Sequence, residues 1–315
     1  MIGKSPARPA TTGHRTIVML KCCVLINAAV LSFMPFAFAQ DEPHSNCEQA
    51  RHLAGRDQPD TFQAPENALK LADCLGHEDP AIRDQFAYGT FVETLRQGDT
   101  SPETLRLLTD KLSGNLRDAG SDSGGFLAPF SVLVLAEIAR ADRLDPFMTA
   151  SERSALARAG SAYLQGIDDY RGFDPGDGWR HGIAHAADLL MQLALNPLLE
   201  EQDARLMLAA ISAQVVPENA HSYIHGEPKR LARPVLYLAM TDLISADEWR
   251  SWFAALEADQ DDPHWQKPYA SLEGLARIHN TENFAAAIFV RASASGEASL
   301  VPIAEAAEAV IRSIP

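Results

Sequence analysis

The segment Ser101-Pro-Glu-Thr-Leu105-Arg-Leu-Leu108-Thr-Asp-Lys-Leu112 carries the pattern that decides the fold. Proline is favoured in the first turn of a helix, where its missing N–H is not needed, so Ser-Pro-Glu indicates a helix start. Leu105, Leu108 and Leu112 recur at intervals of three and four residues and therefore share one face of a helix. This segment is predicted to be an amphipathic helix that packs on its neighbours through that face.

The same pattern continues along the chain on both sides of this segment. Helical spacing of apolar residues predicts further helices over residues 65–75, 80–95, 126–138, 151–169, 179–196, 201–216, 227–241, 246–258, 269–290 and 300–311. No sustained alternation of apolar and polar residues, which would indicate strands, is bounded by turn signals. The sequence therefore predicts an all-α fold.

The predicted helices fall into pairs of regular length. The pairs begin near residues 64, 102, 150, 200 and 246, a spacing of about 40 to 50 residues that is typical of HEAT and armadillo repeats. Such units bury their apolar faces only by stacking on one another. We therefore expect a right-handed α/α superhelix of HEAT/armadillo-like helix pairs, with an irregular α/α bundle as the alternative.

Composition excludes several classes of protein. The 315 residues are 46% hydrophobic and have a formal net charge of −15, so the chain has enough apolar material for a large core and is not disordered. An acidic balance does not supply the basic surface that phosphate binding needs. We therefore expect no nucleic-acid partner.

The first 39 residues form a leader of their own. Four basic residues and no acid precede the apolar run 22–39, which ends in Ala37-Phe38-Ala39. This order is typical of a cleaved secretory signal. We expect residues 1–39 to be a signal peptide and 40–315 to be a single helical domain without a membrane span, periplasmic or secreted. The alternative is an uncleaved signal that anchors the protein to the inner membrane.

Two cysteines, Cys47 and Cys74, remain after the leader is removed. An even pair in an exported protein favours a disulfide. We expect this bond to tie the N-terminal segment to the first clear helix.

The most distinctive stretch runs Asp169-Tyr-Arg171-Gly-Phe-Asp-Pro-Gly-Asp-Gly178-Trp179-Arg-His181-Gly-Ile-Ala-His185-Ala-Ala-Asp188. On a helix, His185 lies about 40° from His181, and Asp188 lies about 20° to its other side, so the three are expected on one stripe, which Gln192 continues. Two imidazoles one turn apart suit a zinc-like divalent metal, with Asp188 either as a third ligand or as a carboxylate that orients one imidazole. Alternatively, either histidine serves as a general base, or the stripe is only a hydrogen-bonded or solvated polar face.

A second polar group occurs in His221-Ser-Tyr-Ile-His225-Gly-Glu227-Pro-Lys-Arg230. In the repeat scheme, the helix that follows lies beside the helix that carries His181. His221, His225 and Glu227 are then candidates to complete a metal site. In the simpler alternative, Glu227 complements a helix N-terminus and the histidines lie in a loop.

At these residues the chain resembles the bacterial domain of unknown function family 2785. The likeness is most specific at Asp169–Phe173 and Gly178–Leu190, and it extends more loosely to 75–84, 126–143 and 226–231. The resemblance implies an all-helical, repeat-like domain and brings no established activity. The leader is an addition to the family pattern, and residues 283–289 depart from it.

Two hypotheses for function remain open. The first is an exported scaffold whose concave face binds an unknown protein, a peptide or an envelope glycan. Its candidate contact residues are Arg171, Trp179, Gln192, Glu227 and Arg230. The second is a metal-dependent hydrolase in which His181, His185 and Asp188 hold the metal and activate water. The sequence contains no complete catalytic signature that decides between them.

Overall fold

The computed structural model describes residues 47, 64–217, 220–259, 261 and 263–315. All of them belong to one compact unit, residues 41–315. The signal peptide expected over residues 1–39 lies outside the described residues.

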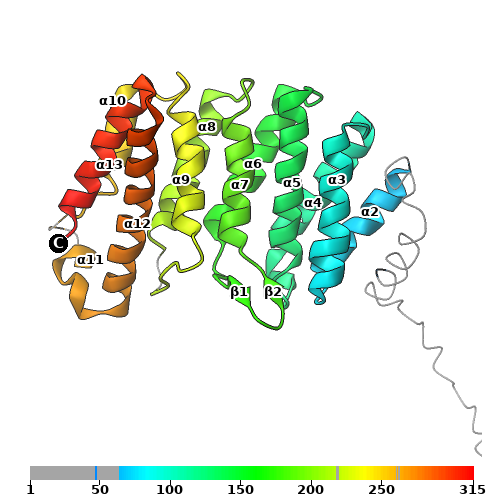
Figure 1. Cartoon of the computed structure of the whole chain (residues 1–315), viewed down its shortest axis with the longest axis horizontal. Helices are drawn as coiled ribbons and strands as arrows, with labels where there is room; N and C mark the ends of the chain where they lie inside the picture. The colour runs from blue at the N-terminus through cyan, green and yellow to red at the C-terminus, as the bar shows by residue number, and fades with distance from the viewer. Residues whose placement is uncertain (1–46, 48–63, 218–219, 260, 262) are drawn as a thin grey trace, which may run out of the picture. The chain divides into compact units, whose positions relative to one another are not determined.

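The described unit is built almost entirely of helices, which confirms the all-α class (Figure 1). The α-helices are α2 (Pro65–Asp73), α3 (Gly89–Gln97), α4 (Pro102–Arg117), α5 (Leu127–Leu144), α6 (Ala150–Gly166), α7 (Gly182–Ala194), α8 (Glu201–Val215), α9 (Glu227–Leu238), α10 (Ala246–Ala254), α11 (Pro263–Gln266), α12 (Leu272–Ser295) and α13 (Val301–Ser313). A π-helical segment, Ala81–Tyr88, runs directly into α3. Short 3₁₀ turns occur at Cys74–Gly76, Ala119–Ser121, Pro268–Ala270 and Ala298–Leu300. Among the described helices, none is both long and apolar enough to cross a bilayer.

Within this unit, the central helices form two layers. Helices α5, α7, α9 and α12 lie side by side in one layer, and α4, α6 and α8 lie side by side in the other (Figure 1). Each helix of the second layer also packs on the helix that follows it in the sequence. Sequential neighbours therefore pair across the layers.

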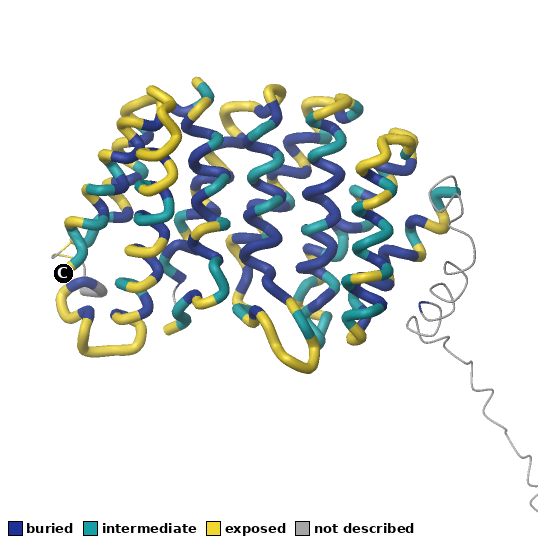
Figure 2. The backbone as a smooth tube through the Cα atoms, in the orientation of Figure 1, coloured by how far each residue is buried: buried dark blue, intermediate teal, exposed yellow. Residues whose placement is uncertain are grey.

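Helices α5 and α7 form the centre of the core, and most of their residues are buried (Figure 2). Leu135 and Ile138 of α5 and Leu189 of α7 are fully buried. Helix α6 approaches α7 closely at Gly160, where an added Cβ would lie 2.7 Å from Leu189 Cδ2. A larger residue at position 160 would require the buried Leu189 side chain to move.

Two helix ends near the candidate site differ from the expected boundaries. Helix α6 ends at Gly166 instead of continuing to residue 169, and α7 begins at Gly182 instead of Trp179. The residues between them form a hairpin of two short strands, β1 (Phe173–Asp174) and β2 (Gly178–Trp179). Trp179 is therefore on a strand, and the prediction of a helix over residues 179–181 was wrong.

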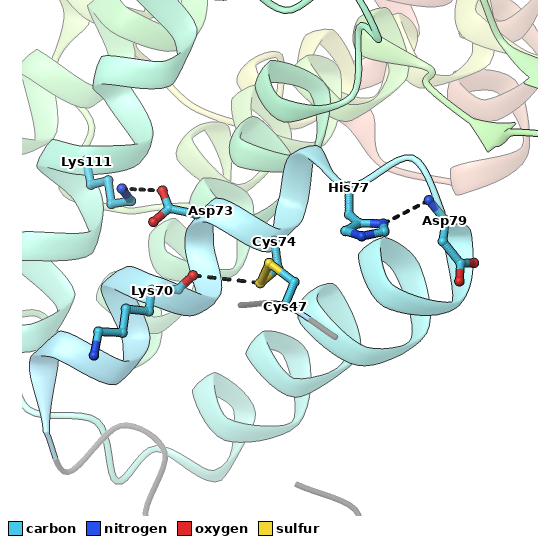
Figure 3. Close-up of a disulfide and its surroundings, with 7 residues drawn as sticks. All are labelled: Cys47, Lys70, Asp73, Cys74, His77, Asp79 and Lys111. Carbon is cyan, nitrogen blue, oxygen red and sulfur yellow. Dashed lines mark hydrogen bonds and ion pairs between the residues drawn. A yellow bond between two sulfur atoms is a disulfide. The ribbon is translucent and has the colours of Figure 1, made fainter. Parts of the chain in front are cut away.

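Cys47 and Cys74 form a disulfide, as expected from the sequence (Figure 3). Cys74 lies at the end of α2, and both cysteines are almost completely buried. Asp73 beside it accepts an ion pair from Lys111 of α4 at 2.6 Å. The bond therefore attaches residue 47 to a helix end that is itself held to the core.

Removal of this disulfide is expected to destabilise the protein. The two cysteines are 27 residues apart, and closing a loop of this length in the unfolded chain corresponds to about 3–4 kcal/mol of stability. We expect Cys47→Ser with Cys74→Ser to lower the free energy of unfolding by about that amount in urea titrations. A reducing agent should lower the stability of the parent protein and leave the double variant unchanged. Equal stability of parent and variant would contradict a structural role for the bond.

Candidate functional site

The hairpin is shaped by its own turn residues. Phe173 pairs with Trp179, and Asp174 pairs with Gly178. The Asp174 carboxylate accepts the backbone N–H groups of Gly176 at 2.7 Å and Asp177 at 3.2 Å. Side chains of this type stabilise tight turns in this way. The Gly- and Asp-rich stretch therefore folds as a turn that sets the position of Trp179.

A buried arginine anchors the hairpin to the N-terminal helices. Arg83 is fully buried and donates a hydrogen bond from Nη2 to the carbonyl of Asp177 at 2.8 Å. Its guanidinium lies 3.9 Å from the centre of the Phe126 ring, and that of Arg180 lies 4.2 Å from the same ring. Arg180 also donates to the Gly124 carbonyl at 2.7 Å. Both ends of β2 are therefore held, one by Arg83 through Asp177 and the other by Arg180 at the residues just before α5.

Gly178 is a position where only glycine fits easily. Its φ is +80°, and an added Cβ would lie 3.1 Å from Arg83 Nη2. Left-handed backbone costs other residues about 1–2 kcal/mol. We expect Gly178→Ala to lower the free energy of unfolding by at least about 1 kcal/mol and to change Trp179 fluorescence, because the hairpin must shift. Gly120→Ala is a suitable control, since an added Cβ there meets no atom within 4 Å. Unchanged stability and fluorescence in Gly178→Ala would show that Arg83 does not constrain the turn.

His181 sits in a strained backbone conformation directly before α7. Its φ is 57°, and it is the one non-glycine residue with positive φ in the described part of the chain. Its ring stacks on the Trp179 indole at a centroid distance of 4.8 Å. Its backbone N–H donates to the Arg171 carbonyl at 3.1 Å. Strain of this kind persists where the surrounding structure fixes it, often at functional sites.

Two histidines from different segments face one buried carboxylate. Glu227 begins α9, and its side chain is 2% exposed. Its Oε1 lies 3.7 Å from His181 Nε2 and 3.6 Å from His225 Nδ1. Its Oε2 accepts the backbone N–H of His225 at 2.9 Å. We call His181, His225 and Glu227 the His/Glu cluster.

The two imidazoles of this cluster present polar atoms without partners. In the part of the chain that the structure describes, His181 Nε2 and His225 Nδ1 are buried and make no hydrogen bond. Buried polar atoms are nearly always paired, so such exceptions need an explanation. Burial, with a smaller contribution from Arg230, lowers the pKa of His181 to about 4. His181 is therefore neutral at pH 7.

The surface over the cluster is aromatic. Trp179 is 38% exposed and Phe173 is 50% exposed, with ring centroids 5.1 Å apart. The His225 ring meets the Trp179 ring edge-on at 5.7 Å. Phe173 was not among the contact residues expected from the sequence, although a lone large apolar residue in a polar turn was a usable signal.

His185 lies next to the cluster and has a structural contact of its own. Its Nδ1 is 3.1 Å from the Pro129 carbonyl, and its ring packs edge-on against Phe130 of α5. Burial, more than the nearby His181, lowers its pKa to about 3. The ring centroids of His181 and His185 are 5.8 Å apart. His185 therefore links α7 to α5.

The remaining members of the expected stripe are engaged elsewhere. Asp188 forms ion pairs with Arg230 and Arg233 of α9. The amide oxygen of Gln192 accepts a hydrogen bond from Arg143 at 3.3 Å. Since eleven residues of helix rise about 16 Å, Gln192 is also far from His181 along α7. His181 and His185 lie in ring contact, as the expected stripe has them. Asp188 does not join them, because it is paired with Arg230 and Arg233.

Two other candidate residues have defined partners. The His221 ring stacks on Tyr170 at a centroid distance of 4.8 Å. Arg171 donates from Nε to both carboxylate oxygens of Asp169, at 2.8 and 3.0 Å. Half of the Arg171 side chain is exposed. It therefore lies at the surface in a fixed orientation.

The metal-ligand set expected from the sequence is not assembled. Within residues 64–217, 220–259 and the rest of the described chain, no group of three or more His, Cys, Asp or Glu side chains is placed to hold a metal ion. Two of the expected ligands already have other partners. Asp188 forms ion pairs with arginines of α9, and the ring nitrogen of His185 lies against the Pro129 carbonyl. The candidate ligands are thus divided among four environments: His181 and His225 at Glu227, His185 at Pro129, Asp188 at the arginines of α9, and His221 at Tyr170.

The chain belongs to the family described as protein of unknown function (DUF2785), whose model matches residues 112–290. This range includes the hairpin and the His/Glu cluster, so the resemblance seen in the sequence is confirmed. Neither the curated proteins nor the solved structures contain a match to this chain.

The buried histidines make stability depend on pH. A histidine whose pKa is about 6.5 when unfolded and about 4 when folded stabilises the protein fully above pH 6.5, and this contribution is lost as the pH falls towards 4. For His181 the loss amounts to about 3 kcal/mol between pH 7 and pH 4. We expect His181→Asn, which tolerates the positive φ, to show a shallower decline of unfolding free energy over this range in urea titrations. Identical slopes for parent and variant would contradict a buried neutral His181.

Proposed function

We propose that this protein is an exported helical-repeat scaffold that binds its partner, a peptide, a protein or an envelope glycan, on the surface formed by Trp179, Phe173 and the His/Glu cluster. Helices α4, α6, α8 and α10 begin at residues 102, 150, 201 and 246, which supports HEAT-like helix pairs. Stacked pairs of this kind form a right-handed superhelix with a concave binding face.

One observation carries the proposal: exposed aromatic rings cover buried polar atoms that lack partners. Trp179 lies over His181, whose Nε2 is unpaired, and Phe173 lies beside it. An unsatisfied buried polar group costs about 1–3 kcal/mol. A ligand that supplies hydrogen bonds to these atoms would recover that free energy. Exposed Trp and neighbouring polar groups are also typical of binding hot spots.

The cluster is held rigidly enough to recognise a partner. Glu227 is oriented by the His225 N–H, and the hairpin is fixed by Arg83. Binding sites with pre-organised groups lose less conformational entropy when a ligand binds. Half-exposed Arg171, held by Asp169, adds a guanidinium next to the hairpin. Beneath these rings, Glu227 accepts the backbone N–H of His225 and so fixes that histidine. Arg230 forms an ion pair with Asp188 and so fixes that carboxylate.

The leader and the disulfide both support an exported location. Residues 1–39 have the order of charge, apolar run and Ala-x-Ala that signal peptides share. The Cys47–Cys74 bond is of a kind that persists in oxidising compartments. We propose a periplasmic or secreted protein; retention of the leader as an inner-membrane anchor is the alternative.

A metal-dependent hydrolase has less support. That function requires His181, His185 and Asp188 to share an open coordination site, and Asp188 is paired with two arginines. The same arginines would have to move before Asp188 could bind a zinc-like ion. Contact with the exposed rings of Trp179 and Phe173 needs no such rearrangement of the arginines.

The proposal predicts that binding depends on Trp179. We expect the mature protein to retain a partner from cell-envelope extract, and Trp179→Ala to weaken the purified interaction by at least about 30-fold, as loss of a hot-spot aromatic does. Leu272→Ala is a matched control, because Leu272 is 71% exposed on α12. Affinity measured by calorimetry should be unchanged in this control.

Two results would contradict this function. The first is a partner bound equally by the parent protein and Trp179→Ala. The second is a stoichiometric divalent metal in natively purified protein that disappears in His181→Ala with His185→Ala, which would favour the hydrolase. Unfolding curves recorded for each variant show whether lost binding reflects lost folding.

A further inference from the structure

Arginines are concentrated on one face of the layer in which α3, α5, α7 and α9 lie side by side, the face that points away from α4, α6 and α8 (Figure 1). Among the acids of these four helices, Asp142 pairs with the other layer and Glu227 belongs to the His/Glu cluster. Three acids remain: Glu93, Glu137 and Asp188. They are outnumbered by five arginines, which we call the arginine face: Arg96, Arg140, Arg143, Arg230 and Arg233.

The position of Arg140 on α5 is fixed by the contacts of the opposite side of that helix. Ser131 accepts a hydrogen bond from Asn115 of α4 at 2.9 Å. Asp142 forms an ion pair with Arg153 of α6 at 2.8 Å. At 100° per residue, Arg140 is about 180° from Ser131 and about 160° from Asp142 around the axis of α5. Arg140 therefore points away from the other layer.

Arg230 and Arg233 extend from α9 on the same side. Arg233 is two residues from both Leu231 and Val235, which are fully buried, so it points about 160° away from each of them. Asp188 of α7 forms ion pairs with Arg230 and, at 3.5 Å, with Arg233. One carboxylate thus positions two guanidinium groups and balances the charge of only one.

Two further contacts position the arginines nearer α3 and α5. Arg96 donates from Nε and Nη2 to the two carboxylate oxygens of Glu137, at 2.9 and 2.6 Å. Arg143 donates to the neutral amide of Gln192 at 3.3 Å. Gln192 is one helical turn after Asp188 on α7. The arginine face is therefore connected from α3 to α9 by contacts between neighbouring helices.

The hydroxyl of Tyr88 lies within the field of both ion-paired groups. Burial, followed by Glu137, raises its pKa to about 12, and Asp188 acts in the same direction. Arg96 and Arg230 oppose this shift. The two ion-paired groups therefore lie around one side chain, close to each other.

The carboxylates of this network are less exposed than its guanidinium groups. The exposed fraction of the side chain is 11% for Glu137 and 15% for Asp188, whereas it is 53% for Arg96 and 35% for both Arg230 and Arg233. In the described part of the chain, Arg140 and Arg143 have no ion pair. The surface that a partner meets is therefore positive, although the net charge of the chain is −15.

Apolar side chains border the arginine face. Leu144, one turn after Arg140 on α5, is 58% exposed. Met191 and Leu195 on α7 and Tyr237 on α9 are partly exposed. A partner that matches this surface carries carboxylates together with apolar groups, a combination that peptides supply and polyphosphates lack.

We propose that the arginine face binds an acidic peptide segment in which Asp or Glu residues alternate with apolar residues. The planar guanidinium matches a carboxylate in two parallel hydrogen bonds, as Arg96 and Glu137 already show. Packed helices lie about 8–10 Å apart, so α5 and α9 are separated by about 16–20 Å. About six extended residues span that distance. The inference goes beyond the proposed function, because Trp179 and Phe173 take no part in it.

Fluorescence anisotropy with two labelled peptides tests the proposal on the purified protein. The first peptide is Gly-Glu-Leu-Glu-Ala-Glu-Leu-Glu-Ala-Gly, and the second has Gln in place of every Glu. We expect the acidic peptide to bind with a Kd below about 100 µM at about 20 mM salt. The neutral peptide should bind at least about tenfold more weakly, because charge-assisted hydrogen bonds are lost. Salt at about 200 mM should weaken binding of the acidic peptide at least about fivefold, because surface charges are screened.

Three results would overturn the proposal. They are absence of saturable binding of the acidic peptide, equal binding of the two peptides, and binding that salt does not weaken. A sulfated hexasaccharide is the comparison ligand. If it binds where the acidic peptide does not, the arginine face recognises an acidic glycan and the peptide proposal is wrong.

A charge-removing double variant locates the binding surface. Arg140→Gln with Arg143→Gln removes two positive charges without breaking a described ion pair. Arg230 and Arg233 are kept, because their loss would leave the largely buried Asp188 unpaired. We expect the double variant to bind the acidic peptide about tenfold more weakly, the combined effect of two exposed charge pairs.

The matched control removes two positive charges from the other layer. Arg117→Gln with Arg158→Gln changes exposed arginines of α4 and α6, which also have no ion pair among the described residues. Its affinity for the acidic peptide should equal that of the parent protein. If the two double variants bind alike, the arginine face is not the binding surface. Unfolding curves show whether each variant is folded, and all variants keep Trp179, so the outcome is separate from the test of the proposed function.

Discussion

The buried guanidinium of Arg83 is the interaction on which the candidate site depends. A fully buried cation is tolerated only when its donors are satisfied. Here Nε donates to Asp84, Nη1 to the carbonyls of His77 and Glu78, and Nη2 to the carbonyl of Asp177. The last of these bonds joins residues 94 positions apart in the chain. The hairpin therefore cannot move without exposing or unpairing this charge, and the positions of Trp179 and His181 follow from it.

The helices could be predicted from the sequence because each has its own local signals. Apolar spacing located α4 and α5, and Ser101-Pro102 marked the start of α4, whereas α5 continues to Leu144, beyond the expected end at residue 138. The start of α7 could not be found in this way. Trp179 and Arg180 have side chains compatible with a helix, and they are held in an extended segment by distant partners, Arg83 and Phe126. Periodicity reports only on neighbours in the sequence, so it placed this boundary three residues too early.

Only part of the candidate site could be predicted, because periodicity does not show which distant residues meet. The expectation that the helix after Glu227 lies beside the helix after His181 agrees with the packing of α9 on α7. This packing brings Glu227 to His181. The stripe of His181, His185 and Asp188 assumed that all three were helical, whereas His181 has positive φ and its ring turns towards Trp179. Asp188 was expected to face a ligand, but only three-dimensional packing shows that Arg230 and Arg233 lie opposite it.

The four residues from Trp179 to Gly182 contribute side chains to two different regions of the surface. His181 belongs to the His/Glu cluster and Trp179 stacks on it, whereas Arg180 and Gly182 line a pocket between α4, α5 and α6. Gly178 and Trp179 form β2, and His181 has a left-handed backbone, so this segment is not helical. The Trp179 ring stacks on His181, whereas the Arg180 guanidinium lies on the Phe126 ring. A helix starting at Trp179 would place these side chains 100° apart around its axis and would not separate them in this way. The left-handed backbone at His181 therefore allows residues of one hairpin to reach both regions. Arg83 holds the hairpin in place through the carbonyl of Asp177.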